Sequence, residues 1–248
     1  MAHESFTLAS RALGELRRIN IYRSPGHDGA AGALVLYMPD GGLQEDFPHV
    51  TSALDAAVRA GEVEPVVVVG IENTERRRDM TGPTEVAKDR EIAPRVGGSA
   101  EFRAFIRDEL MPEVRRRVPG GGRTAIVGES LAGLFVVETF FAEPGLFDVH
   151  IALSPSLWWN DQGLVRGAGE RLRADPGRTG TLYIASAGDD DVDGAIAGFA
   201  AVLRADAPAG LRWYFEPRPD LAHSTIYRAA APGVFKRLFP AGVTASPR

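Results

Sequence analysis

The chain has 248 residues, of which 44% are hydrophobic, so it can bury one sizeable core. It has no cysteine, which excludes disulfides, thiolate metal sites and cysteine nucleophiles. Its net charge of −5 argues against nucleic acid as the main partner, because a phosphate-binding face needs clustered Lys and Arg. The N-terminal stretch has no apolar signal-peptide core, and no apolar run approaches the roughly 20 residues of a membrane span. We therefore expect a cytoplasmic protein with no membrane partner.

Candidate strands and helices alternate along the chain. Two strands are expected at 5–10 and 16–23, followed by a flexible Gly-rich loop at 25–32. Six further strand-like runs lie at 33–38, 66–71, 124–128, 150–154, 181–187 and 211–216. Helical patterns lie between and after them, at 46–60, 99–118, 131–142, 193–205 and 226–238, and Pro112 should kink or shorten the second. The alternation predicts one α/β domain over 1–248: a mostly parallel central sheet with helices on both faces and an antiparallel N-terminal strand pair.

The run "TAIVGESLAGLFVVETFF" has the pattern of a strand, a sharp turn and a helix around Ser130. A serine nucleophile in such a turn adopts a strained backbone conformation, and its neighbours two residues away must be small. Gly128 and Ala132 meet that need, and Gly133 allows the helix to pack closely. The alternative is a serine that merely begins a helix beside a packing glycine. The pattern favours a nucleophile, because parallel sheets place their chemistry beyond the carboxyl ends of their strands.

A serine nucleophile needs a base, usually histidine, and an acid that orients it. His223 follows the last expected strand and precedes the last helix, which is where the base falls in the chain order serine, acid, histidine. The acidic loop "GDDDVDG" follows the strand before it, and we favour Asp191 as the acid, with Asp190 in reserve. At least two of the four aspartates in this loop must be solvated or cap a helix.

Two backbone N–H groups are needed to stabilise an oxyanion. Leu131 is expected to supply one, because it directly follows the nucleophile. The loop "YMPDGGLQ" after the first central strand should supply the other, from Gly42 or, as second choice, Gly41.

Six segments together resemble the putative-esterase family of α/β-hydrolases, which includes enterochelin esterases and other carboxylic esterases. The resemblance covers nearly the whole chain and rests on "ESFTLASRALGELRRINIYR", "LYMPDGG", "VVVGIENTERRRDMTGP", "VGESLAGLF", "LSPSLWWN" and "AHSTIYRAA". It implies an α/β-hydrolase fold and a serine esterase with Ser130 as nucleophile and His223 as base. Some siderophore esterases of this kind work with a Ser-His pair and no matching acid.

Two further segments are candidates for contact with substrate. Arg78 beside Asp79 could meet an anionic or catechol-like group at the rim of the site, although a solvated charged loop is the alternative. Of Trp158 and Trp159, we expect one to be buried and the other to form the wall of an aromatic or acyl pocket.

The sequence therefore predicts a serine esterase that acts on a small-molecule carboxylic ester without a cofactor or metal. An acyl-enzyme would form on Ser130 and be released by water that His223 activates. Two alternatives are acyl transfer to an alcohol and, from another class of protein, ligand binding on a hydrolase fold without catalysis.

Overall fold

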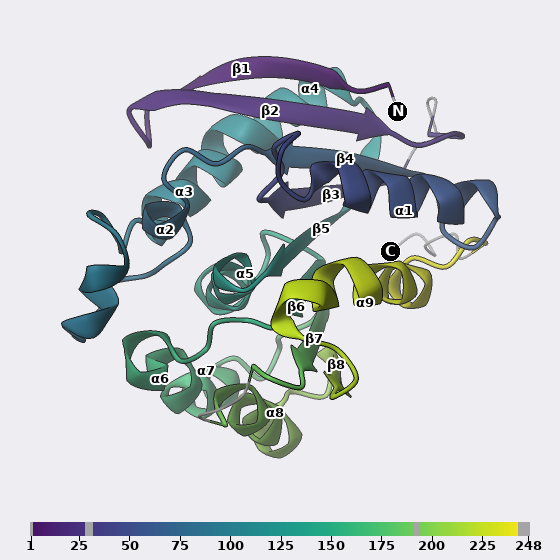
Figure 1. The fold of residues 1–248 in the computed structure, drawn as a ribbon. Coiled ribbons are helices and arrows are strands. Elements are labelled where there is room, and N and C mark those ends of the chain that lie inside the picture. The colour runs from purple at the N-terminus through teal and green to yellow at the C-terminus, as the bar shows by residue number, and fades with distance from the viewer. Residues whose placement is uncertain (1, 28–31, 191–193, 243–248) are drawn as a thin grey trace.

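A computed structural model describes residues 2–27, 32–190 and 194–242, which share one eight-stranded sheet (Figure 1). The strands lie in the order β1-β2-β4-β3-β5-β6-β7-β8. Their bounds are β1 Glu4–Ser10, β2 Glu15–Arg23, β3 Ala33–Pro39, β4 Val66–Ile71, β5 Gly121–Glu129, β6 Val149–Leu153, β7 Thr181–Ala187 and β8 Arg212–Arg218. β1 and β2 are antiparallel to each other and β2 is antiparallel to β4, whereas the strands from β4 to β8 are parallel. The predicted sheet, with its antiparallel N-terminal pair, is confirmed.

Helices cover both faces of the sheet, and each face has its own hydrophobic core. α1 (Phe47–Arg59) and α9 (His223–Leu238) pack on one face. The other face carries α3 (Ser99–Phe105), α4 (Met111–Arg117), α5 (Leu131–Ala142), α6 (Trp159–Arg166), α7 (Ala168–Ala174) and α8 (Ala195–Asp206). The short α2 (Arg76–Asp79) and a 3-10 turn at Lys88–Ile92 lie in the connection between β4 and α3. None of the helices in the described ranges is long and apolar enough to cross a membrane.

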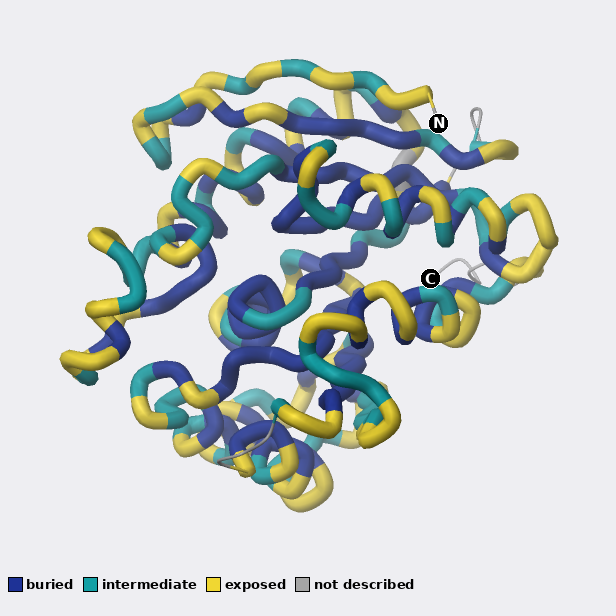
Figure 2. The backbone as a smooth tube through the Cα atoms, in the orientation of Figure 1, coloured by how far each residue is buried: buried dark blue, intermediate teal, exposed yellow. Residues whose placement is uncertain are grey.

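The central strands are buried on both faces, as Figure 2 shows in dark blue. Every residue of β3, β4, β6 and β7 is buried, which explains why these segments are continuous apolar runs. The carboxyl ends of β3 to β7 point to the same edge of the sheet. Loops that are far apart in the sequence therefore meet at that edge.

The helix expected at 99–118 is interrupted, as Pro112 predicts. α3 ends at Phe105, a π-helical turn spans Ile106–Leu110, and α4 begins at Met111 with the proline in its first turn. Proline has no N–H to donate to the carbonyl one turn earlier, and the wider π turn accommodates it where no such bond is needed.

Candidate active site

Ser130 occupies a strained turn between β5 and α5. Its φ of 59° and ψ of −120° are rarely adopted by a residue with a side chain. Three hydrogen bonds hold its backbone: its N–H donates to Leu153 O at 3.0 Å, and its carbonyl accepts from Leu134 and Ser156 at 2.9 and 3.0 Å. This is the conformation expected of a nucleophile directed away from the sheet.

The glycines around Ser130 are required by close backbone packing. A Cβ on Gly128 would lie 2.5 Å from the carbonyl carbon of Ala132, so strand and helix nearly touch there. A Cβ on Gly133 would lie 3.0 Å from Pro155 Cα. The requirement for small residues, inferred from the sequence, thus has a direct steric cause.

His223 is held by Asp190 from the loop that follows β7. Asp190 Oδ1 binds His223 Nδ1, and Oδ2 accepts the N–H of Ala187 at 2.9 Å. The Asp190 side chain is only 5% exposed, so both of its oxygens have fixed partners in a protected place. Asp191, the acid favoured from the sequence, lies outside the described residues. Its alternative, Asp190, has the contact that an orienting acid needs.

Asp189 has a different role from its neighbour Asp190. Its Oδ1 accepts the backbone N–H of His223 at 2.7 Å, and Thr225 Oγ1 accepts the N–H of Ala222 at 3.2 Å. These bonds satisfy donors at the start of α9, which therefore begins at His223 and not at residue 226 as expected. His223 is thus the first residue of a helix, not part of the preceding loop.

The other ring nitrogen of His223 contacts Glu129, the residue before Ser130. His223 Nε2 lies 3.0 Å from Glu129 Oε1. Ser130 Oγ lies 3.4 Å from Ser156 Oγ, and no hydrogen bond joins Ser130 Oγ to His223 in the described part of the chain. Burial raises the pKa of the Glu129 carboxyl to about 7, against the opposite effects of His223 and Arg76. Sequence reasoning did not single out Glu129.

The two expected oxyanion donors differ in their present partners. Leu131 is the first residue of α5, so its N–H has no intrahelical acceptor. The N–H of Gly42 donates to Glu45 Oε2 at 2.7 Å, and that of Gly41 donates to Ile71 O at 2.9 Å. A Cβ on Gly41 would lie 2.3 Å from the backbone of β4, so this glycine is needed for packing. An oxyanion role for Gly42 stays a prediction and requires Glu45 to move away.

Arg76 joins the edge of the site to the loop after β3. Its guanidinium makes a two-pronged ion pair with Asp40, with Nε–Oδ1 and Nη2–Oδ2 distances of 2.6 and 2.9 Å, and Nη2 lies 3.5 Å from Glu129 O. Asp40 has a φ of 58° and follows β3 directly. This ion pair joins α2 to the end of β3 next to the carbonyl of Glu129.

Arg78 is surrounded by carboxylates. Its guanidinium binds Glu15 at 3.0 Å, Asp79 at 2.7 Å and Glu75 at 3.3 Å, and only 13% of its side chain is exposed. Asp79 is also bound to Arg17, and both of those side chains are fully buried. These contacts attach α2 to β2. The expected contact of Arg78 with an anionic substrate group stays a prediction.

A cavity of about 550 Å³ adjoins α2 and is lined by four arginines. Arg77 and Arg95 are the exposed arginines of the set; Arg95 binds Glu75, whereas no ion pair of the Arg77 side chain is found among the described residues. The complete lining is Glu75, Arg76, Arg77, Arg78, Ala93, Pro94 and Arg95. This surface suits an anionic group.

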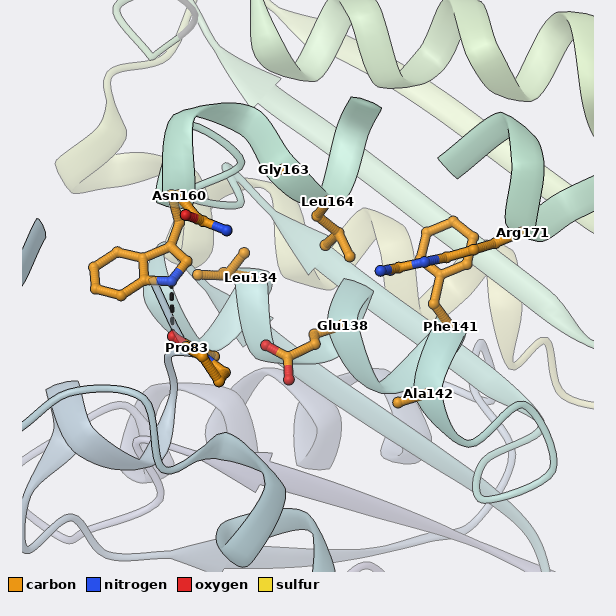
Figure 3. A pocket seen from close by; sticks show the side chains of 11 residues that line it. Pro83, Leu134, Glu138, Phe141, Ala142, Asn160, Gly163, Leu164 and Arg171 are labelled. Carbon is orange, nitrogen blue, oxygen red and sulfur yellow. Dashed lines mark hydrogen bonds between the residues drawn. The ribbon is translucent and has the colours of Figure 1, made fainter. Parts of the chain in front are cut away.

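Trp158 and Trp159 differ in exposure, as the sequence suggested. Trp158 is 41% exposed, whereas Trp159 is buried and its Nε1–H donates to Gly82 O at 2.9 Å. Trp159 lines a second cavity of about 470 Å³ that runs along α5 from Leu134, one turn beyond Ser130 (Figure 3). Glu138 of α5 and Arg171 of α7 face this space in the same view.

Comparison with known proteins identifies similar chains. Residues 10–196 match the family described as "Putative esterase". The chain is 37% identical to ferri-bacillibactin esterase BesA of Bacillus subtilis over 146 residues, which are 52% of this chain and 50% of that protein. It is 41% identical to the siderophore enterobactin esterase of Emericella nidulans over 75 residues, 29% of this chain and 25% of the other. The fold matches an IroE-like serine hydrolase from Shewanella oneidensis with a TM-score of 0.85 and 26% identity, covering 96% of this chain and 80% of that one. The chain thus spans half or less of the length of these two curated relatives.

Proposed function

Because the chain belongs to the putative esterase family, we propose that it is a serine esterase that cleaves carboxylic esters through an acyl-enzyme on Ser130. One observation carries the proposal: a serine in a strained strand-to-helix turn directly follows Glu129, whose carboxylate contacts a histidine that a buried aspartate also binds. Acyl transfer and binding without catalysis gain no support from the reported relatives, which are named esterases or hydrolases.

The steps assign a role to each group. His223 Nε2 takes the proton of Ser130 Oγ as that oxygen attacks the ester carbonyl, and Asp190 stabilises the imidazolium. The imidazolium then protonates the leaving alcohol. His223 next accepts a proton from water as that water attacks the acyl group, and it returns the proton to Ser130 Oγ when the C–O bond to the serine breaks and the acid is released. The Leu131 N–H, at the positive end of α5, stabilises the oxyanion in both halves. Catalytic hydrogen bonds are often long before substrate binds, so Ser130 and His223 need not be bonded in the free protein.

The test of the reaction is hydrolysis of 4-nitrophenyl acetate by Ser130→Ala, with Ser156→Ala as the matched control. Loss of Ser130 should lower kcat by at least about 10³-fold, because the acyl-enzyme can no longer form. Loss of Ser156 removes one long neutral hydrogen bond and should cost less than about tenfold. Peptide mapping after treatment with a fluorophosphonate should place the adduct on Ser130. Equal rates in wild type and folded Ser130→Ala would refute the proposal.

We further propose that the ester is of the siderophore type, with an anionic or catechol-bearing part against the arginine-lined cavity. The names of the two curated relatives and the cluster of Arg76, Arg77 and Arg95 support this substrate class. Arg77 is better placed than Arg78 to meet an anion, because Arg78 already binds three carboxylates.

The test compares Arg77→Ala with Arg212→Ala, an exposed arginine at the opposite edge of the sheet. Arg77→Ala should raise KM for an anionic aryl ester by roughly tenfold and leave KM for a neutral ester unchanged. Equal effects on both esters, or the same effect from Arg212→Ala, would contradict an anion-binding role. Release of the monomer acid from a tricatecholate triester, followed by chromatography, tests the substrate class directly.

A further inference from the structure

Glu129 and Ser130 are consecutive residues, and Glu129 contacts His223 Nε2, the nitrogen that the proposed reaction assigns to Ser130. We propose that Glu129 is a positioning residue that competes with Ser130 for His223 Nε2, so that the enzyme becomes active when the proton shared by Glu129 and His223 is lost. The inference rests on the proposed roles of Ser130 and His223 and adds a residue to them.

Glu129 competes for His223 Nε2 because of where its side chain lies. Glu129 Oε1 lies 3.0 Å from His223 Nε2, and the Glu129 side chain is only 16% exposed. Its backbone cannot shift easily, because Glu129 is the last residue of β5 and pairs with Leu153 of β6. Asp190 holds the opposite ring nitrogen, so the imidazole lies between two carboxylates. Nε2 can serve Ser130 only when it is not engaged by Glu129.

Charged and titratable groups from every neighbouring element surround this pair. Arg76 of α2 places a positive charge beside Glu129, and it also binds Asp40. Asp46 lies before α1 and binds His49, whose ring packs against Tyr227 of α9. The hydroxyl of Tyr227 is buried without a hydrogen-bond partner among the described residues. Among the described residues, the charged and titratable groups around Glu129 and His223 are Asp40, Asp46, His49, Arg76, Asp189, Asp190 and Tyr227.

One proton decides the state of the pair. With Asp190 bound to Nδ1–H, a hydrogen bond between Nε2 and Oε1 needs one more proton, which makes either imidazolium with carboxylate or imidazole with carboxylic acid. Either form blocks the Nε2 lone pair. When this proton leaves to solvent, two lone pairs face each other and Glu129 no longer holds the ring. The free lone pair then accepts the proton of Ser130 Oγ.

The direction of the pH dependence follows from the proton that Glu129 and His223 share. The Glu129 carboxylate favours the protonated pair, so it shifts the start of activity towards alkaline pH. Burial raises the pKa of Glu129 to about 7, which places the change near neutral pH. Loss of the carboxylate should therefore extend activity to lower pH.

The kinetic test measures kcat/KM for a neutral 4-nitrophenyl ester from pH 5 to 9. Glu129→Gln and Glu129→Ala should each move the acid limb about one pH unit towards acid, so that their activity at pH 6, relative to the plateau, exceeds that of wild type by roughly tenfold. Glu64→Gln is the matched control, because Glu64 is also a part-buried glutamate of raised pKa but lies at the amino edge of the sheet beside Arg123. An unchanged limb in both folded Glu129 variants, or an equal shift in Glu64→Gln, would overturn the inference.

A second measurement does not depend on turnover. In Ser130→Ala labelled with ¹⁵N-histidine, the Nε2 signal of His223 near neutral pH should move towards that of an unprotonated nitrogen when Glu129→Gln is added. An unchanged signal would overturn the competition even if Ser130 is the nucleophile. Full esterase activity in Ser130→Ala would instead refute the proposed function, while the spectrum would still report on the pair.

Discussion

Asp189 and Asp190 are adjacent in the chain, yet they bind different parts of His223. Asp190 binds the ring and Asp189 binds the backbone N–H, so the first orients the imidazole and the second satisfies a donor at the start of α9. The pattern of four aspartates in one loop could not distinguish these roles. They depend on where α9 begins, and its N-cap is Ala222, which gives no capping signal in the sequence.

We expect Asp190→Asn to lower kcat by on the order of 10²–10⁴-fold, because an amide cannot stabilise the imidazolium. Asp189→Asn should retain most of the activity and lose about 0.5–1 kcal/mol of the free energy of unfolding, since the amide oxygen still accepts the helix N–H without the charge. Steady-state kinetics and urea unfolding of both variants check this. Full activity in Asp190→Asn, together with loss of activity in Asp191→Asn, would restore Asp191 as the acid.

Among the elements, the connection from Gly82 to Asp89 is attached to the start of α6. Trp159 donates to Gly82 O, Asn160 Oδ1 accepts the N–H of Glu85 at 3.0 Å, and the Asn160 N–H donates to Asp89 at 2.8 Å. Asn160 has a φ of 51°, which this side chain tolerates better than most. Gly82, Trp159 and Asn160 line the cavity along α5, so these bonds stabilise one of its walls.

Trp159→Phe should lower the free energy of unfolding by about 1–3 kcal/mol, because it leaves the buried carbonyl of Gly82 without its donor. Trp213→Phe, on the half-buried edge strand β8, is the matched control and should cost less. Urea unfolding followed by circular dichroism gives both values. Equal losses in the two variants would mean that the bond to Gly82 contributes nothing specific.

The sequence predicts some elements better than others for physical reasons. The central strands are buried on both faces, so their apolar runs are unbroken and easily recognised. The turn at Ser130 is recognisable because sterics demand Gly128 and Gly133. α2 has only four residues, and α6 and α7 are short helices separated by Gly167, so none of them is long enough to show a clear helical period in the sequence. The contact of Glu129 with His223 joins residues 94 positions apart, and no local pattern encodes it.

At the scale of the whole molecule, two buried groups give stability opposite dependences on pH. His150 is packed between Phe140 and Phe147, and burial lowers its pKa to about 3 from an ordinary 6.5. Below pH 6.5 the unfolded chain binds a proton at His150 that the folded chain does not bind. His150 therefore lowers the free energy of unfolding as the pH falls below 6.5. Glu129 has a raised pKa, so the folded chain keeps a proton that the unfolded chain loses, and stability falls as pH rises from 4.5 to 7.

Between pH 4.5 and 6.5 the two effects oppose each other. We compare the free energy of unfolding of each variant with that of wild type. The difference should grow in favour of His150→Leu as the pH falls, and in favour of Glu129→Gln as the pH rises, each by up to about 1 kcal/mol per pH unit. Chemical denaturation at four pH values in this window checks both slopes. The slope, not the absolute change, is the readout, so any loss of packing cancels. Parallel curves for wild type and either variant would contradict the assigned pKa of that group.

The exposed ring of Trp158 has a practical consequence. It lies two residues from Ser156, whose hydroxyl is 3.4 Å from Ser130 Oγ, and its ring centroid is 5.9 Å from that of Trp159. The chain has only three tryptophans, and the third is on β8. The protein therefore carries an intrinsic fluorophore close to the proposed nucleophile. Its emission offers a readout, without any attached label, of whether an aromatic ester arrives at Ser130, reacts there and leaves.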